Sequence, residues 1–144
     1  MSSMSTRIPR ELLQAYLATL YEAQTGEPAP LVLRIGEHSP RLLAAHRKAK
    51  VDASVFITAF NPEGQPLSAE ENEVRHQQLM NALRDRVPVL FEGRGYSAAN
   101  DWEERSVLAL GVPLGMARQL GMRFGQNAIV WSGADAVPRL ILLR

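Results

Sequence analysis

Cysteine is absent from this chain of 144 residues. That absence excludes a thiol nucleophile, a thiolate metal site and a disulfide bridge. A strong net charge is absent as well, because 16 basic and 15 acidic side chains leave a formal charge of +1. A chain so close to neutrality has no bulk electrostatic attraction for nucleic acid or for an anionic membrane. We therefore expect neither as a partner.

Long apolar runs are also missing. No run approaches the roughly 18 residues that a membrane-spanning helix needs, and residues 1–10 lack the apolar core of a signal peptide. We therefore expect a cytoplasmic protein, monomeric by default. Residues 1–8 are polar and rich in serine, which predicts a disordered tail. Residues 9–144 fit a single domain with one core, since the hydrophobic fraction of 46% is ordinary for a globular protein.

The hydrophobic spacing predicts a single α/β (α+β) domain. Ser68 and Glu71 form a capping box, and residues 54–60 are apolar on both faces, as in an interior strand covered on both sides. The glycine-containing stretch 92–105 is predicted to be a long irregular loop. The elements make a mixed sheet of about six or seven strands with helices packed on it. Helices are predicted over 9–18, 40–49, 69–86 and 113–121, and strands over 19–23, 31–35, 54–60, 87–91, 106–110, 127–131 and 139–143.

Polar residues stand at the ends of these elements, where a core would be apolar. At about 100° per residue, Asn72 and Arg75 fall on the core side of the helix that begins after Ser68. They would then lie beside Asn61, at the end of the central strand. Such junctions of strand ends and helix starts are where α/β proteins bind ligands. In the alternative, Asn72 and Arg75 satisfy backbone groups of the neighbouring loops.

Other candidates lie in and around the 92–105 stretch. Glutamates occupy the start of helix 69–86, so an anion would have to bind Arg75 or Arg94 instead. Trp102 is either a stacking residue over a ligand or a hydrophobic plug that pins the loop. Glu104 is either a general base or one half of an ion pair.

Catalysis and metal binding have little support in the sequence. His76 lies on the core side of its helix, as a base or as a satisfied core-edge histidine. Only His76 and Glu104 are plausible acid–base groups. No metal-binding motif and no Ser-His-Asp signature is present. We therefore expect no metal and no cofactor, and we favour binding over catalysis.

Gln126 and Asn127 stand where a buried strand begins. Two amides in such a place have several donors and acceptors to satisfy with little water. We predict that at least one of them binds the backbone of the 92–105 stretch or of the turn at Asn61. This contact would tie the C-terminal hairpin to the site.

Several short motifs together resemble a bacterial family known as domain of unknown function 3293. The resemblance spans nearly the whole chain, and the order and spacing of the motifs make it specific. The family has no assigned activity, and Phe60 stands where it has tryptophan. The resemblance implies a small cytoplasmic bacterial protein and favours Glu104 over Glu103 as the acid of the site. The motifs are Ala15-Tyr16 with Thr19 and Tyr21, Arg34-Ile35-Gly36, residues 58–62, Glu71-Asn72, Trp102 with Glu104 and Ser106, and residues 125–131.

Convergent strand ends and one long loop, carrying donors and acceptors, predict a binding site for a small polar or anionic ligand. In the alternative, the protein is a non-catalytic interaction domain and the same polar cluster is a structural scaffold. The predicted site residues are Asn61, Asn72, Arg75, Arg94, Trp102, Glu104, Ser106, Gln126 and Asn127.

Overall fold

The computed structural model describes residues 6–144. The prediction of a disordered tail therefore falls, for residues 1–5, outside the described residues. In the rest of that segment Ile8 is buried, and the Thr6 hydroxyl donates a hydrogen bond to the carbonyl of Arg144. The two ends of the described chain are thus joined to each other.

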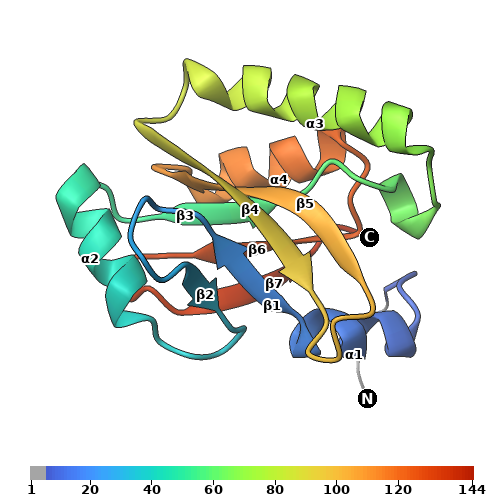
Figure 1. Cartoon of the computed structure of the whole chain (residues 1–144), viewed down its shortest axis with the longest axis horizontal. Helices are drawn as coiled ribbons and strands as arrows, with labels where there is room; N and C mark the ends of the chain where they lie inside the picture. The colour runs from blue at the N-terminus through green and yellow to red at the C-terminus, as the bar shows by residue number, and fades with distance from the viewer. Residues whose placement is uncertain (1–5) are drawn as a thin grey trace.

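The described residues form one α+β domain, as predicted (Figure 1). The helices are α1 (Arg10–Ala18), α2 (Pro40–Ala49), α3 (Ala69–Arg84) and α4 (Leu114–Arg123), with a short 3-10 turn, η1 (Pro62–Gly64). The predicted capping box of Ser68 and Glu71 begins α3. The strands are β1 (Leu20–Ala23), β2 (Leu31–Leu33), β3 (Ser54–Ile57), β4 (Val89–Tyr96), β5 (Glu103–Leu110), β6 (Ala128–Ser132) and β7 (Pro138–Leu142).

The strands form one sheet in the order β2-β1-β4-β5-β3-β6-β7, and every neighbouring pair is antiparallel. The prediction of a mixed sheet is therefore wrong. Strands joined through a helix suggest parallel crossovers. In this fold, however, strands that are joined through a helix are never neighbours in the sheet. This holds for β2 and β3, for β3 and β4, and for β5 and β6.

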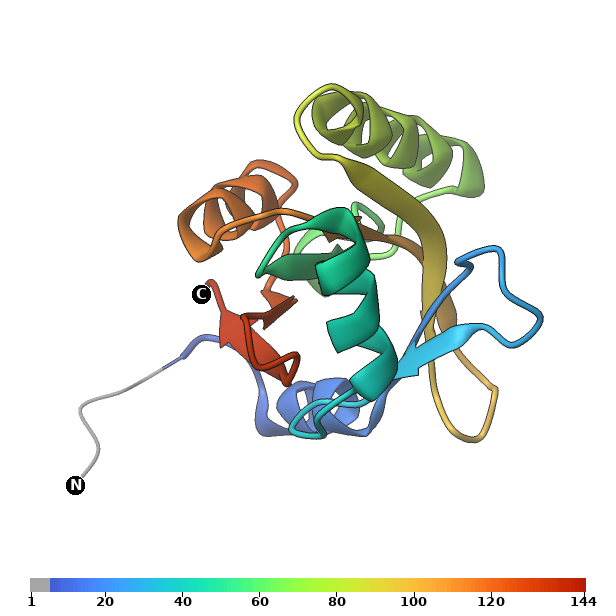
Figure 2. The same cartoon turned by 90° about the vertical axis from the view of Figure 1, so that its left-hand side faces the viewer.

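The interior position of β3 is confirmed, since it lies between β5 and β6. Successive side chains of a strand point to opposite faces. Val55 and Ile57 accordingly pack in the cluster beneath α3 and α4, whereas Phe56 packs with Leu42 of α2. Figure 2 shows α3 and α4 on one side of the curled sheet, with α2 and α1 on the other. Both faces of the sheet are thus covered.

The predicted irregular loop 92–105 is wrong. β4 continues to Tyr96 and β5 begins at Glu103, so only residues 97–102 form the tip of a long hairpin. The glycine that indicated a loop marks a close approach instead. A Cβ on Gly93 would overlap the backbone oxygen of Glu22 and lie 3.1 Å from Phe56 Cε2. Gly121, predicted to end its helix, likewise lies inside α4, where a Cβ would overlap Leu143.

Within residues 6–144, no helix combines the length and the apolar character needed to cross a bilayer.

Candidate ligand-binding site

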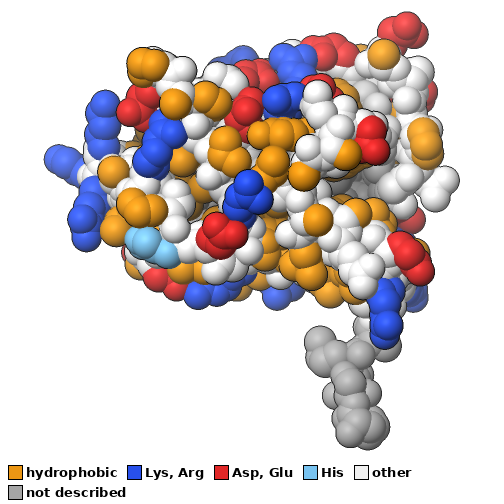
Figure 3. All heavy atoms as spheres, turned by 60° about the horizontal axis from the view of Figure 1, so that its bottom comes forward, with side chains coloured by type: hydrophobic (Ala, Val, Ile, Leu, Met, Phe, Trp, Pro, Cys, Tyr) orange, Lys and Arg blue, Asp and Glu red, His pale blue; other side chains and the backbone are white. Residues whose placement is uncertain are grey.

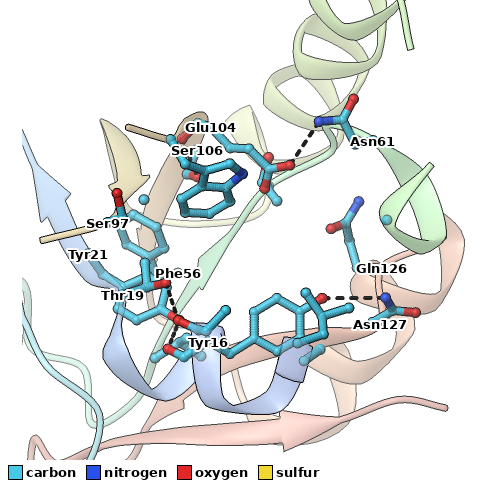
Figure 4. Close-up of a pocket in the computed structure, with 18 of the residues that line it drawn as sticks. Tyr16, Thr19, Tyr21, Phe56, Asn61, Ser97, Glu104, Ser106, Gln126 and Asn127 are labelled. Atoms are coloured by element: carbon cyan, nitrogen blue, oxygen red, sulfur yellow. Dashed lines mark hydrogen bonds between the residues drawn. The ribbon is translucent and has the colours of Figure 1, made fainter. Parts of the chain in front are cut away.

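A cavity of about 680 Å³ lies between α1, the adjoining ends of β3, β5 and β6, and the 97–102 tip (Figure 4). Small-molecule sites typically enclose about 300–1,000 Å³. Most of the wall is apolar, and four aromatic rings contribute to it: Tyr16, Tyr21, Phe56 and Trp102. Figure 3 shows hydrophobic side chains exposed across the middle of a face seen from the side of α1.

The structure brings six of the nine predicted site residues to this cavity and leaves three away from it. Asn72, Arg75 and Arg94 do not line the wall. The six that do are Asn61, Trp102, Glu104, Ser106, Gln126 and Asn127.

Glu104 is the half-buried carboxylate of the cavity wall. It extends from β5, and its Oε2 accepts a hydrogen bond of 3.0 Å from Asn61 Nδ2. Within residues 6–144 it forms no ion pair. Burial raises the pKa of Glu104, and the hydrogen bond from Asn61 opposes this only in part. The cavity wall thus contains a carboxyl group that no basic side chain of residues 6–144 pairs with.

Asn61 fixes the position of that carboxylate. It follows β3 in the left-handed region, with φ 46° and ψ 64°. Its Oδ1 accepts hydrogen bonds from Leu67 N at 3.0 Å and from Asn72 Nδ2 at 2.9 Å. Because two donors occupy the oxygen, the amide nitrogen must face Glu104. Asn72 also accepts from the backbone N–H of Asn61, so it positions Asn61 and does not reach the cavity itself.

Gln126 joins the C-terminal part of the chain to the turn at Asn61, as predicted. Its Nε2 donates to the carbonyls of Phe60, at 3.1 Å, and Phe124, at 3.2 Å. Both amide protons are therefore used within the protein, and Oε1 is left as an acceptor. Figure 4 shows this oxygen on the cavity side. The neighbouring Asn127 donates from Nδ2 to the hydroxyl of Tyr16, at 3.4 Å.

The two predicted anion-binding arginines have other partners. Arg75 donates from Nε to the carbonyl of Ala59, at 2.7 Å, and from Nη2 to the carbonyl of Phe124. It therefore has the backbone-satisfying role that the sequence left open. Arg94 pairs with Glu22 at 3.1 Å and Glu103 at 3.4 Å, and its guanidinium lies 4.2 Å from the centroid of the Tyr96 ring. Among the described residues no lysine or arginine lines the cavity.

His76 also lies away from the cavity. It is fully buried on α3, with Nε2 3.2 Å from a carboxylate oxygen of Glu92. Glu104 is consequently the acid–base candidate that faces the cavity. Within residues 6–144, no group of three or more acidic or histidine side chains is placed to hold a metal ion.

Trp102 is the last residue of the hairpin tip, directly before β5. Its side chain lines the cavity, and the residue is 42% exposed. More than half of its surface is covered by the protein, so both roles, stacking on a ligand and pinning the tip, stay predictions.

The site prediction omitted Tyr16, Thr19, Tyr21 and Phe56. The Tyr21 hydroxyl donates to the carbonyl of Tyr16 at 2.7 Å. The pKa of Tyr16 is raised, mainly by burial and to a smaller extent by the carboxylate of Glu104. The hydrogen bond from Asn127 opposes this increase only in part. Burial also raises the pKa of Tyr21 strongly. A signal for three of these residues was present, because Tyr16, Thr19 and Tyr21 belong to a motif of the family resemblance.

Comparison with known proteins identifies the family. The sequence model of the family described as "Protein of unknown function (DUF3293)" matches residues 57–129, which is half of the chain. The chain therefore belongs to this family, as the resemblance of its motifs predicted. Neither the curated proteins nor the solved structures contain a match.

Proposed function

We propose that this member of the family binds a small molecule in the cavity between α1 and the sheet. The observation that carries the proposal is the cavity itself, of about 680 Å³, with an apolar wall and a half-buried carboxylate. An apolar cavity with a few convergent polar groups is typical of a small-molecule site. The hydrogen bonds around Asn61 support the proposal, because they hold Glu104 in place before a ligand arrives.

The wall also narrows the chemistry of the ligand. Four aromatic rings favour an apolar or aromatic body. A polar group of the ligand would lie near Glu104 and Gln126. The anionic ligand considered from the sequence loses its support, because Arg75 and Arg94 bind other groups and the lining carries a negative charge. We therefore propose a ligand that carries a polar group but no negative charge.

The interaction-domain alternative explains only part of the polar cluster. Asn72, Arg75 and Arg94 do hold segments of the fold together. None of these three residues lines the cavity. We include in the proposal the setting expected from the sequence: a monomer in a bacterial cytoplasm with no nucleic-acid or membrane partner. The formal charge of +1 supports the part of this setting that concerns nucleic acid and membranes.

A thermal-melt screen of the wild-type protein against metabolites tests the proposal. A ligand present at 100 times its dissociation constant adds about 2.7 kcal/mol of stability. The matched variants are Ala15→Trp and Gln14→Trp, on exposed positions of α1. Ala15 lines the cavity and Gln14 does not.

We expect some compound to raise the melting temperature of the wild type and of Gln14→Trp, with the shift reduced in Ala15→Trp. Equal shifts in both variants would place binding outside the cavity. The absence of any shift across the screen would favour the interaction-domain alternative.

A further inference from the structure

We propose that the ligand carries a cationic nitrogen, as an ammonium or amidinium group, that binds the carboxylate of Glu104. This inference rests on the proposed function and specifies the ligand of the same cavity. It draws on three features of the wall: the unbalanced carboxylate, the orientation of the neighbouring amides, and the aromatic rings.

The carboxylate is the first feature. Glu104 receives one side-chain hydrogen bond, from a neutral amide, and among residues 6–144 it has no cationic partner. A half-buried charge in an apolar wall loses hydration, and an opposite charge within about 4–6 Å compensates that loss. Two acidic side chains nearby do have such a partner, since Glu22 and Glu103 both pair with Arg94. Asp101, which also lines the cavity but is exposed at the hairpin tip, accepts a hydrogen bond from the hydroxyl of Ser97. Glu104 is thus available to pair with a cation from outside the chain.

The orientation of the amides is the second feature. Asn61 directs its nitrogen to Glu104 because its oxygen already has two donors. Gln126 uses both N–H groups on carbonyls, so it offers its oxygen to the cavity. Glu104 and Gln126 therefore both present acceptors, and they require hydrogen-bond donors on the ligand. The Tyr16 hydroxyl can donate or accept, so it does not decide the matter.

The aromatic rings are the third feature. Tyr16, Tyr21, Phe56 and Trp102 all line the same cavity as Glu104. Aromatic faces attract cations through the ring quadrupole, and such cages recognise ammonium ligands. An anion would meet these rings and the carboxylate without a compensating positive charge. The three features agree on the sign of the ligand's charge.

Matched probes that differ only in charge test the inference. The cations are phenethylamine and benzamidine, and their neutral counterparts are 2-phenylethanol and benzamide. Phenylacetate serves as the anion. Binding is measured by calorimetry and thermal shift on the whole chain. The variants are Glu104→Gln, which keeps the shape, and Glu103→Gln, which removes an adjacent exposed charge that does not line the cavity.

We expect at least one cation to bind the wild type more tightly than its neutral counterpart, and phenylacetate to bind least. Glu104→Gln should weaken binding of that cation about tenfold or more, whereas Glu103→Gln should change it little. Binding should also weaken as the pH falls through the raised pKa of Glu104, because protonation removes the charge. In Glu104→Gln this pH dependence should be lost.

Two results would overturn the inference while leaving the proposed function intact. One is tighter binding of the neutral or anionic probes, or of only such compounds from the metabolite screen. The other is cation binding that Glu104→Gln leaves unchanged. If neither these probes nor any compound of the screen binds in the cavity, the proposed function is rejected and this inference with it.

Discussion

Ionisation of Glu104 should favour binding of a cationic ligand but lower the stability of the empty protein. Because its pKa is raised in the folded protein, ionisation costs more in the folded state than in the unfolded chain. Its contribution to stability is therefore fully present below the unfolded pKa, ordinarily 4.5, and is lost as the pH rises through the folded pKa. Above the folded pKa the ionised side chain destabilises the empty protein.

This sign predicts the effect of Glu104→Gln on stability. The neutral amide avoids the cost of ionisation, and its oxygen can still accept from Asn61. We expect the variant to melt at a higher temperature than the wild type at neutral pH. The difference should shrink as the pH falls through the folded pKa toward the ordinary value of 4.5, and it should be smallest below that value. Melts across this pH range provide the measurement, and a variant less stable than the wild type at neutral pH would contradict the prediction.

Asn61 permits a separate test, because its backbone and its side chain contribute differently. Asn61→Ala removes hydrogen bonds to Leu67, Asn72 and Glu104 and leaves a non-glycine residue at φ 46°. We expect it to cost about 1–3 kcal/mol for the lost partners, and up to about 1–2 kcal/mol more for the left-handed backbone.

The control is Asn61→Gly, which removes the same hydrogen bonds but adopts positive φ without strain. Chemical denaturation of both variants gives the two costs. The glycine variant should be the more stable of the pair. Equal stabilities would show that the left-handed backbone at this position stores no strain.

At the scale of the element, strand β4 depends on the lack of a side chain at Gly93. A methyl group there would overlap the backbone of β1 and press on Phe56. Backbone cannot yield as a flexible side chain can, so we expect Gly93→Ala to destabilise the protein by about 1–3 kcal/mol.

Gly115→Ala is the matched control for this prediction, because a Cβ at Gly115 in α4 meets no atom within 4 Å. Alanine is the better helix former, so this variant should be neutral or more stable by up to about 1 kcal/mol. Urea denaturation measures both. A Gly93→Ala protein as stable as the wild type would mean that β1 and β4 can separate without loss.

At the scale of the whole molecule, local patterns in the sequence predicted the elements, but not which segments would meet. The apolar run at 54–60 was sufficient to place β3 inside the sheet, because both faces of the segment need cover. Gly93 looked like part of a loop because its role depends on Glu22 and Phe56, which are remote in sequence. The antiparallel sheet was missed for the same reason, since neighbour order is set by tertiary packing.

The sequence predicted the residues of the site that stand at the ends of strands, but not the contacts that they make with remote segments. Asn61 and Gln126 were identified because polar residues at the ends of buried strands are conspicuous. Arg75 was taken for a ligand contact because its acceptors, the carbonyls of Ala59 and Phe124, carry no signal in the sequence. Tyr16 was omitted although it belongs to a motif of the family resemblance, because that motif does not indicate that α1 covers a cavity.

The placement of α1 leads to a last prediction, about how stability is distributed over the molecule. No residue of α1 is buried, whereas β3 is buried along its whole length between two neighbouring strands. Elements with few buried contacts open at low free-energy cost, and core strands open only with global unfolding. Amide hydrogen exchange should therefore be fastest in α1 and in the 97–102 tip, and slowest in β3 and β5.

A ligand in the cavity would contact α1, the 97–102 tip and the sheet at once, since all three line it. Binding should therefore slow exchange in α1 and in the tip, which are the regions with stability to gain. Helix α2 provides the internal control, because none of its residues lines the cavity. Exchange measured with and without the first compound from the screen tests this. Slowing confined to α2 or α3 would mean that the compound binds elsewhere, and that α1 does not close over the ligand.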